Sequence, residues 1–145
     1  MQSNAITGQT NDPNRLTSFT NTGFTVGNDT CTNTSGSDYV AWNFRKQKGF
    51  FDVVTWTGND TGGRQIPHEL DCVPGCVMIK RYNGTEDWAV WHSGATVGTP
   101  GNTMTLNNET IATDNVIYFW DTPPTKEHFT VGTSNRVNVL GEQYV

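Results

Sequence analysis

The sequence has few cations, few cysteines and no long apolar run, and each scarcity excludes a class of protein. Lys and Arg together number 9 in 145 residues, against 14 Asp and Glu, so the formal net charge is −5 at pH 7. Binding of nucleic acid through its phosphates requires clustered cations, so we expect no nucleic-acid partner. The acidic balance also argues against an anionic membrane surface. No apolar run approaches the roughly 18 residues of a membrane-spanning helix, so we expect no membrane partner.

Only three cysteines are present, Cys31, Cys72 and Cys76, and the N-terminal stretch "MQSNAITGQT" has neither the basic start nor the apolar segment of a secretory signal. An odd number of cysteines without such a signal predicts free thiols. His68 precedes Cys72 and Cys76 at intervals of four, which on a helix would align three metal ligands. Because Pro74 opposes a helix there, we predict buried thiols in a strand and its turn, and no metal or other cofactor.

Residues that favour strands and turns dominate the remaining composition. The chain contains 23 Thr, 15 Asn and 15 Gly; Thr favours strands, whereas Asn and Gly favour turns. No segment has apolar residues at the three-to-four residue spacing of an amphipathic helix. We therefore predict an all-β fold, an antiparallel β-sandwich or jelly roll. The expected strands are Phe24–Gly27, Tyr39–Arg45, Phe50–Thr57, Cys76–Arg81, Asp87–His92, Thr103–Leu106, Val116–Trp120 and Phe129–Gly132.

The stretch "RYNGTEDWAVWHS" carries the sharpest hairpin signal and the candidate ligand-binding residues. Asn83-Gly84 is a pair that favours a tight turn between two strands. In the strand that follows, Trp88 and Trp91 lie on opposite faces because side chains alternate along a strand. Either protein covers both faces, or Trp88 and Trp91, together with Tyr82, offer an aromatic platform to a sugar. The expected core aromatics are Phe50, Trp56, Trp88, Trp91, Phe119 and Trp120.

The sequence repeats itself after 105 residues. Pairing Phe24 with Phe129 and continuing without a gap to Val145 gives 17 pairs, of which 8 are identical. Upstream, "MQSNAITGQT" resembles "MTLNNETIAT" if two residues are gapped. Such a long period indicates repetition of a whole domain. We interpret residues 1–48 as the C-terminal part of a preceding β unit and residues 49–145 as one β-sandwich unit lacking its last strand. The cationic "FRKQKG", residues 44–49, is then a solvated linker.

Several motifs form a combined pattern: "LTSFTNTGFTVGNDT", "GSDYVAWNF", "FFDVVTWTGND", "IPHELDCVPGCVMIKR", "DWAVWH" and "FWDTPPTKEHFTVG". Together they resemble a repeated β-domain of tail-fibre-like structural proteins of marine and other tailed bacteriophages, which often adjoins a concanavalin-like lectin jelly roll. The fourth motif also resembles the His-x-Leu-Gly-x-x-Pro hairpin of fibre and spike domains, with His68, Leu70 and Pro74 matching. Asp71 stands in place of that Gly, and Asp tolerates a left-handed backbone better than most residues.

The resemblance implies a non-enzymatic virion structural protein: a tail fibre, spike or capsid decoration module that contacts other copies of itself and other virion proteins and contributes to host attachment. The alternative is a lectin-like module that binds host surface carbohydrate through Tyr82, Trp88 and Trp91. An enzyme is a third possibility. The sequence offers no paired carboxylates, nucleophile elbow, metal triad or phosphate loop, so we expect no catalytic residues.

The repeat also bears on assembly. Val40 aligns with Val145, and Val40 continues into "AWNF", a strand that the second unit lacks within the sequence. A sandwich without this strand has an unpaired edge. We hypothesise that one chain's N-terminal segment completes the next chain's C-terminal unit by strand addition. The alternative is a longer fibre chain, trimeric as many phage fibres are, whose own further strands complete it.

Overall fold

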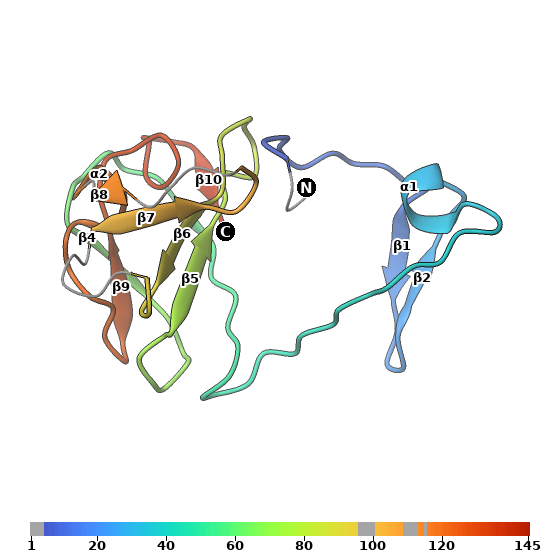
Figure 1. The fold of residues 1–145 in the computed structure, drawn as a ribbon, viewed down its shortest axis with the longest axis horizontal. Coiled ribbons are helices and arrows are strands. Elements are labelled where there is room, and N and C mark those ends of the chain that lie inside the picture. Colours follow the sequence, from blue (N-terminus) through green and yellow to red (C-terminus); the bar gives the residue numbers. More distant parts are fainter. Residues whose placement is uncertain (1–4, 96–100, 109–112, 115) are drawn as a thin grey trace. The chain divides into compact units, whose positions relative to one another are not determined.

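The computed structural model describes residues 5–95, 101–108, 113–114 and 116–145, which divide into two compact units (Figure 1). The large unit comprises Arg45–Val145 and the described residues of Met1–Gln9, and the small unit comprises Thr10–Phe44. The division between Phe44 and Arg45 falls within the cationic stretch interpreted as a linker. The grouping of Gln9 with the large unit, where its backbone N–H donates to Tyr82 O, was not expected.

The large unit is built from short antiparallel strands and one helical turn. Its strands are β3 (Trp56–Thr57), β4 (Arg64–Pro67), β5 (Cys76–Ile79), β6 (Ala89–His92), β7 (Asn102–Thr105), β8 (Thr113–Asp114), β9 (His128–Val131) and β10 (Gln143–Tyr144), and the turn is α2 (Val116–Phe119). The strand orders are β5-β6-β7-β8, β4-β9 and β10-β3, and every pairing is antiparallel. The predicted all-β class is therefore confirmed. Among the described residues, no helix is long and apolar enough to span a bilayer.

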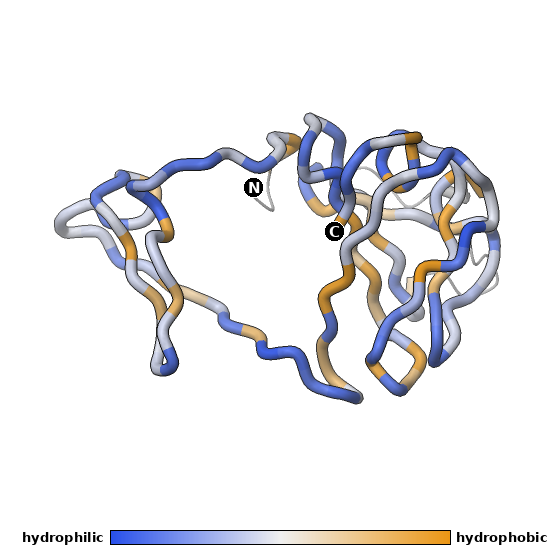
Figure 2. Tube along the Cα trace, turned by 180° about the vertical axis from the view of Figure 1, so that it is seen from behind, coloured by the Kyte–Doolittle hydropathy of each residue, from blue (hydrophilic) through white to orange (hydrophobic). Residues whose placement is uncertain are grey.

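These sheets share one apolar core. Trp56 on β3 stacks on Tyr144 of β10, with ring centroids 5.5 Å apart, and meets Phe129 of β9 edge-on at 5.7 Å. The indole N–H of Trp56 donates to Val137 O at 3.1 Å, so the ring is fixed at both ends. The other buried apolar residues of this core are Ile66, Val77, Ile79, Ala89, Trp91, Phe119 and Val131. Figure 2 shows apolar stretches on the strands of this unit and hydrophilic stretches in several of its loops.

The small unit consists of β1 (Leu16–Phe19), β2 (Phe24–Val26) and a single helical turn, α1 (Thr30–Asn33). Strands β1 and β2 pair antiparallel, with Phe19 opposite Phe24. No residue of this unit is classed as buried, and Phe19, Val40 and Trp42 are 76%, 82% and 79% exposed. Its conformation therefore rests on hydrogen bonds and not on a core of its own.

Several strand predictions were wrong. Tyr39–Arg45 forms no strand, and Phe50–Thr57 forms one only at Trp56–Thr57, with Phe51 in an isolated bridge to Gln47. Val116–Trp120 forms the helical turn α2, in which Trp120 N donates to Val116 O at 3.0 Å. Of the predicted core aromatics, Trp56, Trp91 and Phe119 are buried, Trp88 is half-buried, and Phe50 and Trp120 are 64% and 39% exposed.

The predicted hairpin exists, but its turn differs. Strands β5 and β6 pair with Ile79 opposite Ala89, so a nine-residue loop and not a two-residue turn joins them. Neither Asn83 nor Gly84 has a positive φ. The buried ammonium of Lys80 holds the loop by donating to the carbonyls of Arg81 and Gly84 at 2.8 and 3.2 Å. By contrast, Asp71 has φ of +62°, the left-handed conformation that the Gly of the hairpin pattern suggested.

Candidate functional site

The two stretches that repeat in sequence also repeat in hydrogen bonding. The hydroxyl of Tyr144 accepts from the backbone N–H of Val139, five residues earlier, at 2.9 Å, and donates to the carbonyl of Asn135, nine residues earlier, at 3.0 Å. Tyr39 makes the same two bonds at the same spacings, both at 2.9 Å. The glycine three residues before each tyrosine has a left-handed φ, +78° in one copy and +80° in the other.

The turn before each tyrosine repeats as well. Asp29 and Ser134 each accept, through a side-chain oxygen, the backbone N–H two residues later, at 2.8 and 3.2 Å. Their carbonyls accept the N–H groups three and four residues later in both copies. Gly27 and Gly132 precede them, and a Cβ there would lie 2.4 and 2.1 Å from a carbonyl oxygen, of Asn14 in one copy and Ile117 in the other. The repeat is therefore structural as well as sequential.

The environments of the two copies differ sharply. Tyr144 and Val131 are fully buried, whereas their counterparts Tyr39 and Val26 are 50% and 37% exposed. In the large unit, β3 pairs with β10 and β4 pairs with β9. In the small unit, β2 pairs only with β1, and no described strand of that unit stands where β3 or β4 would be. The small unit thus repeats the hydrogen bonds of residues 134–144 without their burial.

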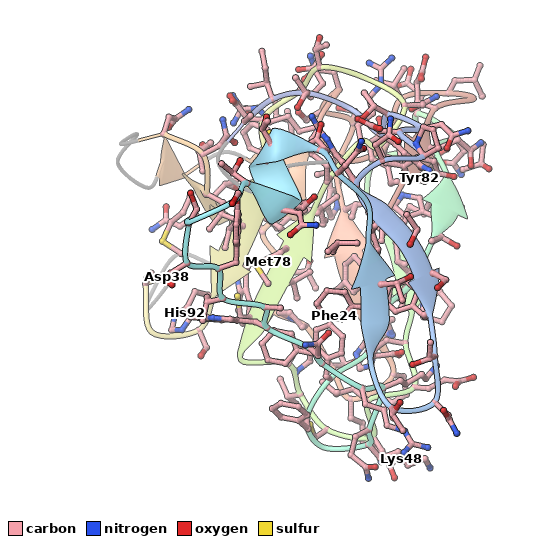
Figure 3. The ribbon with its side chains drawn as sticks, turned by 90° about the vertical axis from the view of Figure 1, so that its right-hand side faces the viewer. Phe24, Asp38, Lys48, Met78, Tyr82 and His92 are labelled. Carbon is pink, nitrogen blue, oxygen red and sulfur yellow. The ribbon has the colours of Figure 1, made fainter. Side chains whose placement is uncertain are left out.

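Beside β10, in the large unit, lies an apolar pocket of about 440 Å³. Two stretches of the chain supply most of its lining: residues 50–54, which precede β3, and residues 74–78, which include most of β5. Val145, directly after β10, also lines the pocket. Three of the apolar side chains that line it are exposed, Phe50 at 64%, Val53 at 55% and Met78 at 50%. Met78 projects from β5 in Figure 3.

The polar side chains that line this pocket, Asp52 and His68, already have partners. The carboxylate of Asp52 accepts from Val53 N and Glu69 N, both at 2.8 Å, and forms an ion pair with Lys46 at 3.0 Å. Burial alone would raise the pKa of Asp52, but these contacts outweigh it and the pKa lies below its ordinary value. The imidazole of His68 lies 3.2 Å from a backbone carbonyl through Nε2 and accepts a backbone N–H through Nδ1.

The predicted ligand-binding residues do not form one surface. Trp91 lies in the core and is 5% exposed, so it offers no face to a sugar. Trp88 is half-buried and lines the pocket. Tyr82 does not line it; its hydroxyl donates to the Gln143 side chain at 3.3 Å. Of the two alternatives that the sequence left open for this strand, the burial of Trp91 favours the one in which protein covers both tryptophans.

The cysteines are free thiols, but not buried as predicted. Cys31 and Cys76 are exposed and Cys72 is half-buried. Cys76 is on β5, which leaves the side chain on the exposed face of that strand. In the part of the chain that the structure describes, no group of three or more His, Cys, Asp or Glu side chains could hold a metal ion.

Sequence reasoning did not find Val53 and Met78, the residues of the pocket walls. The available signal was the pair of strand predictions, Phe50–Thr57 and Cys76–Arg81, that contain these two residues.

Comparison with known proteins gives one match. Over residues 1–145 the sequence matches the family described as "Domain of unknown function (DUF7483)". No curated protein and no solved structure matches the chain. Because the match extends over both units, the chain belongs to the DUF7483 family of domains.

Proposed function

We propose that the chain is a non-enzymatic structural module of a tailed-bacteriophage particle: part of a tail fibre, a spike or a capsid decoration, built from tandem β units and contributing to host attachment. The observation that carries this proposal is the repeated substructure. The same tyrosine and turn hydrogen bonds recur after 105 residues. A unit reused along a chain, each copy contacting its neighbours, suits an extended appendage better than a single catalytic domain.

The charged groups support a structural role. Among the described residues, two carboxylates have a lowered pKa, Asp29 and Asp52, and both accept backbone N–H groups, so their charge holds turns in place. Lys80 is buried, and burial lowers its pKa, but its ammonium caps two loop carbonyls. Asp29, Asp52 and Lys80 thus each hold backbone groups, which leaves little for acid–base chemistry at these three positions.

The experiment for this proposal is a protein inventory of purified particles of the phage that carries the gene. We expect peptides of this chain in density-purified particles, in several copies per particle, with immunogold label confined to one part of the particle. A non-structural protein of the same phage, followed in parallel, controls for carry-over from the lysate. Recovery of the chain only in the soluble fraction of the lysate would contradict a virion role.

Carbohydrate binding is the second candidate, favoured by one observation: Trp88 lines the pocket beside β10. A stacked sugar also needs hydrogen-bond partners for its hydroxyl groups, and the polar side chains of this pocket are already engaged. The test is a glycan array with the native chain and Trp88→Ala, with Tyr82→Phe as a control outside the pocket. Binding that Trp88→Ala abolishes while the variant stays folded would favour this candidate.

A further inference from the structure

One indole of the large unit lies against the backbone of two successive glycines. A Cβ atom at Gly62 would lie 2.3 Å from Cζ3 and 2.5 Å from Cη2 of the Trp120 ring, and a Cβ atom at Gly63 would lie 2.9 Å from its Nε1. Beside the ring's edge, the neighbouring ring atoms would be farther away than they are, so both Cβ positions lie over the ring's face. The backbone of Gly62 and Gly63 therefore covers one face of this indole.

The glycine at position 62 is explained by this contact and not by its own backbone. Gly63 has φ of +74°, a conformation that favours glycine. The φ of Gly62 lies outside the left-handed region, so it does not by itself require glycine. A side chain at Gly62 would instead collide with the Trp120 ring. The chain thus provides room for the indole on this side.

The backbone that carries the indole is also unusual. The helical turn α2 ends at Phe119, and the two residues that follow, Trp120 and Asp121, have φ of +46° and +49°. Glycine is the common residue in a left-handed position after a helix, because a Cβ atom disfavours that conformation. Strain of this kind persists only where surrounding contacts maintain it. The contact of the Trp120 ring with Gly62 and Gly63 is such a contact.

The other face of the indole is accompanied by exposed carboxylates. Trp120 is 39% exposed although one face is covered, so its exposed area lies on the opposite face and the rim of the ring. Asp121 is exposed, and it accepts Gly101 N through Oδ1 at 3.0 Å, which leaves Oδ2 without a partner among the described residues. Asp60 is also exposed, has no side-chain partner in the described part of the chain, and lies within roughly 7 Å of Gly62 along the backbone.

We propose that Trp120 is the stacking platform of a binding site for an uncharged sugar ring. The C–H groups on one face of a pyranose pack against an indole face, while its hydroxyl groups donate hydrogen bonds to acceptors beside the ring. Asp60 and Asp121 provide such acceptors, and bonds to a carboxylate are stronger than bonds to a neutral oxygen. Because these groups are anionic, a sugar that itself carries a carboxylate or a sulfate is disfavoured.

The surroundings of the ring favour a sugar over a protein partner. Val116, one helical turn before Trp120, is also exposed, at 45%. The centre of a protein interface, however, is depleted of charged residues, and carboxylates buried there without a cation would be costly. A sugar leaves Asp60 and Asp121 bonded to hydroxyl groups and water. The site is separate from the pocket lined by Trp88, and the inference does not depend on whether the chain is a virion protein.

The experiment uses the full-length chain, labelled with ¹⁵N in its five tryptophans, whose indole N–H groups are followed by NMR. Oligosaccharides of glucose, galactose and N-acetylglucosamine are added in turn up to about 10 mM, a range that detects a Kd near 1 mM. At least one should shift the Trp120 signal, which Trp120→Phe identifies, while the core signals of Trp56 and Trp91 stay in place. Oligomers of the corresponding uronic acids should bind at least about tenfold more weakly.

Gly62→Ala is the most informative variant, because it keeps Trp120 but displaces the ring from its support. We expect binding to weaken by about tenfold or more. The matched control is Gly23→Ala, at a glycine without a left-handed φ and with no atom within 4 Å of its Cβ position, and its affinity should equal that of the native chain. Trp120→Ala should abolish binding, Trp120→Phe should retain part of it, and Asp60→Asn should weaken it.

Three results would overturn the proposal. One is that none of these oligosaccharides shifts the Trp120 signal. Another is that binding survives both Trp120→Ala and Gly62→Ala in chains whose core signals show that they are folded, or is lost only in Trp88→Ala, which would assign the sugar to the pocket. The third is a Trp120 signal that shifts with protein concentration and not with sugar, which would make this face a contact between copies of the chain.

Discussion

A matched pair of tyrosine variants, Tyr144→Phe and Tyr39→Phe, tests whether the two copies of the repeat are equivalent in bonding and different in burial. Each substitution removes one hydroxyl that accepts a backbone N–H and donates to a backbone carbonyl over the same spacings. The local chemistry removed is therefore the same. The only large difference is exposure, since Tyr144 is fully buried and Tyr39 is 50% exposed.

The expected magnitudes follow from which groups water can reach. Without the hydroxyl of Tyr144, the half-buried N–H of Val139 loses its partner, and an unsatisfied buried group costs about 1–3 kcal/mol. Asn135 is exposed, so water can replace the bond to its carbonyl. We therefore expect Tyr144→Phe to lower the free energy of unfolding by about 2 kcal/mol. Water can replace both bonds of Tyr39, so Tyr39→Phe should cost no more than about 0.5 kcal/mol.

Urea unfolding followed by tryptophan fluorescence measures the difference, because the core indoles of Trp56 and Trp91 report on the large unit. Hydrogen exchange at the Val139 and Thr34 amides should show accelerated exchange at the corresponding amide in each variant. Equal losses of stability in the two variants would refute the reasoning, because burial would then not decide the cost. A negligible effect of Tyr144→Phe would mean that its hydroxyl bonds contribute nothing.

Three further predictions concern the buried amide, the acid response and the thiols. Asn138→Ala should lower the free energy of unfolding by about 3 kcal/mol, because the fully buried Asn138 amide bonds to Asn59, Thr61 and Arg64. The control is Asn33→Ala, at the exposed counterpart, which should lose much less stability on urea unfolding. Because the pKa of Asp52 is lowered in the folded chain, its carboxylate stabilises the fold fully above the ordinary pKa of 3.8, and this stabilisation is lost as pH falls through the folded pKa. Asp52→Asn should therefore lose less stability than the native chain as pH falls through this range. Equal losses of stability in the native and variant chains would show that Asp52 does not cause the acid response. Purified protein should contain no stoichiometric zinc by elemental analysis, since Cys31, Cys72 and Cys76 gather no further ligands among the described residues; one zinc per chain, lost on Cys72→Ser, would contradict this.

The sequence predicted the fold class because residues that favour strands and turns are distributed along the whole chain. The predicted strands Phe24–Gly27, Cys76–Arg81, Asp87–His92 and Phe129–Gly132 were found with slightly different bounds. The failure at Val116–Trp120 has a tertiary cause. The N–H groups of Gly132 and Ser134 donate to the carbonyls of Tyr118 and Ile117 at 2.7 and 2.9 Å. The β-branched and aromatic residues of this segment favour a strand locally. In the folded chain the segment is instead a helical turn, whose carbonyls accept these two N–H groups from a distant segment.

The candidate site shows a similar division. Alternation along a strand predicted that Trp88 and Trp91 lie on opposite faces, but no local pattern states whether a face is covered by another part of the chain. Trp91 entered the core, and Trp88 came to line a pocket whose walls are residues 50–54 and 74–78. Bringing these walls together depends on the pairing of β10 with β3 and with Lys80. No short stretch of sequence predicts such pairings between distant segments.

The residues that are identical in the two copies of the repeat show which side chains the shared substructure requires. Of the 17 aligned pairs, the identical ones include the glycines with a close backbone approach or a left-handed φ, the tyrosine and the asparagine. All of these shape the backbone or bond to it. Where the large unit buries Val137 completely, the small unit has Thr32. Local bonds therefore suffice to build the substructure without a core, as the exposed small unit shows.

Yet the small unit also keeps apolar residues that local bonding does not require. Val26 retains the identity of the fully buried Val131, although it is 37% exposed, and Trp42 is 79% exposed in the stretch that follows Tyr39. Exposed apolar side chains cost free energy in water and contribute nothing to turns. The hydrogen bonds within the small unit therefore do not explain why these apolar residues are present.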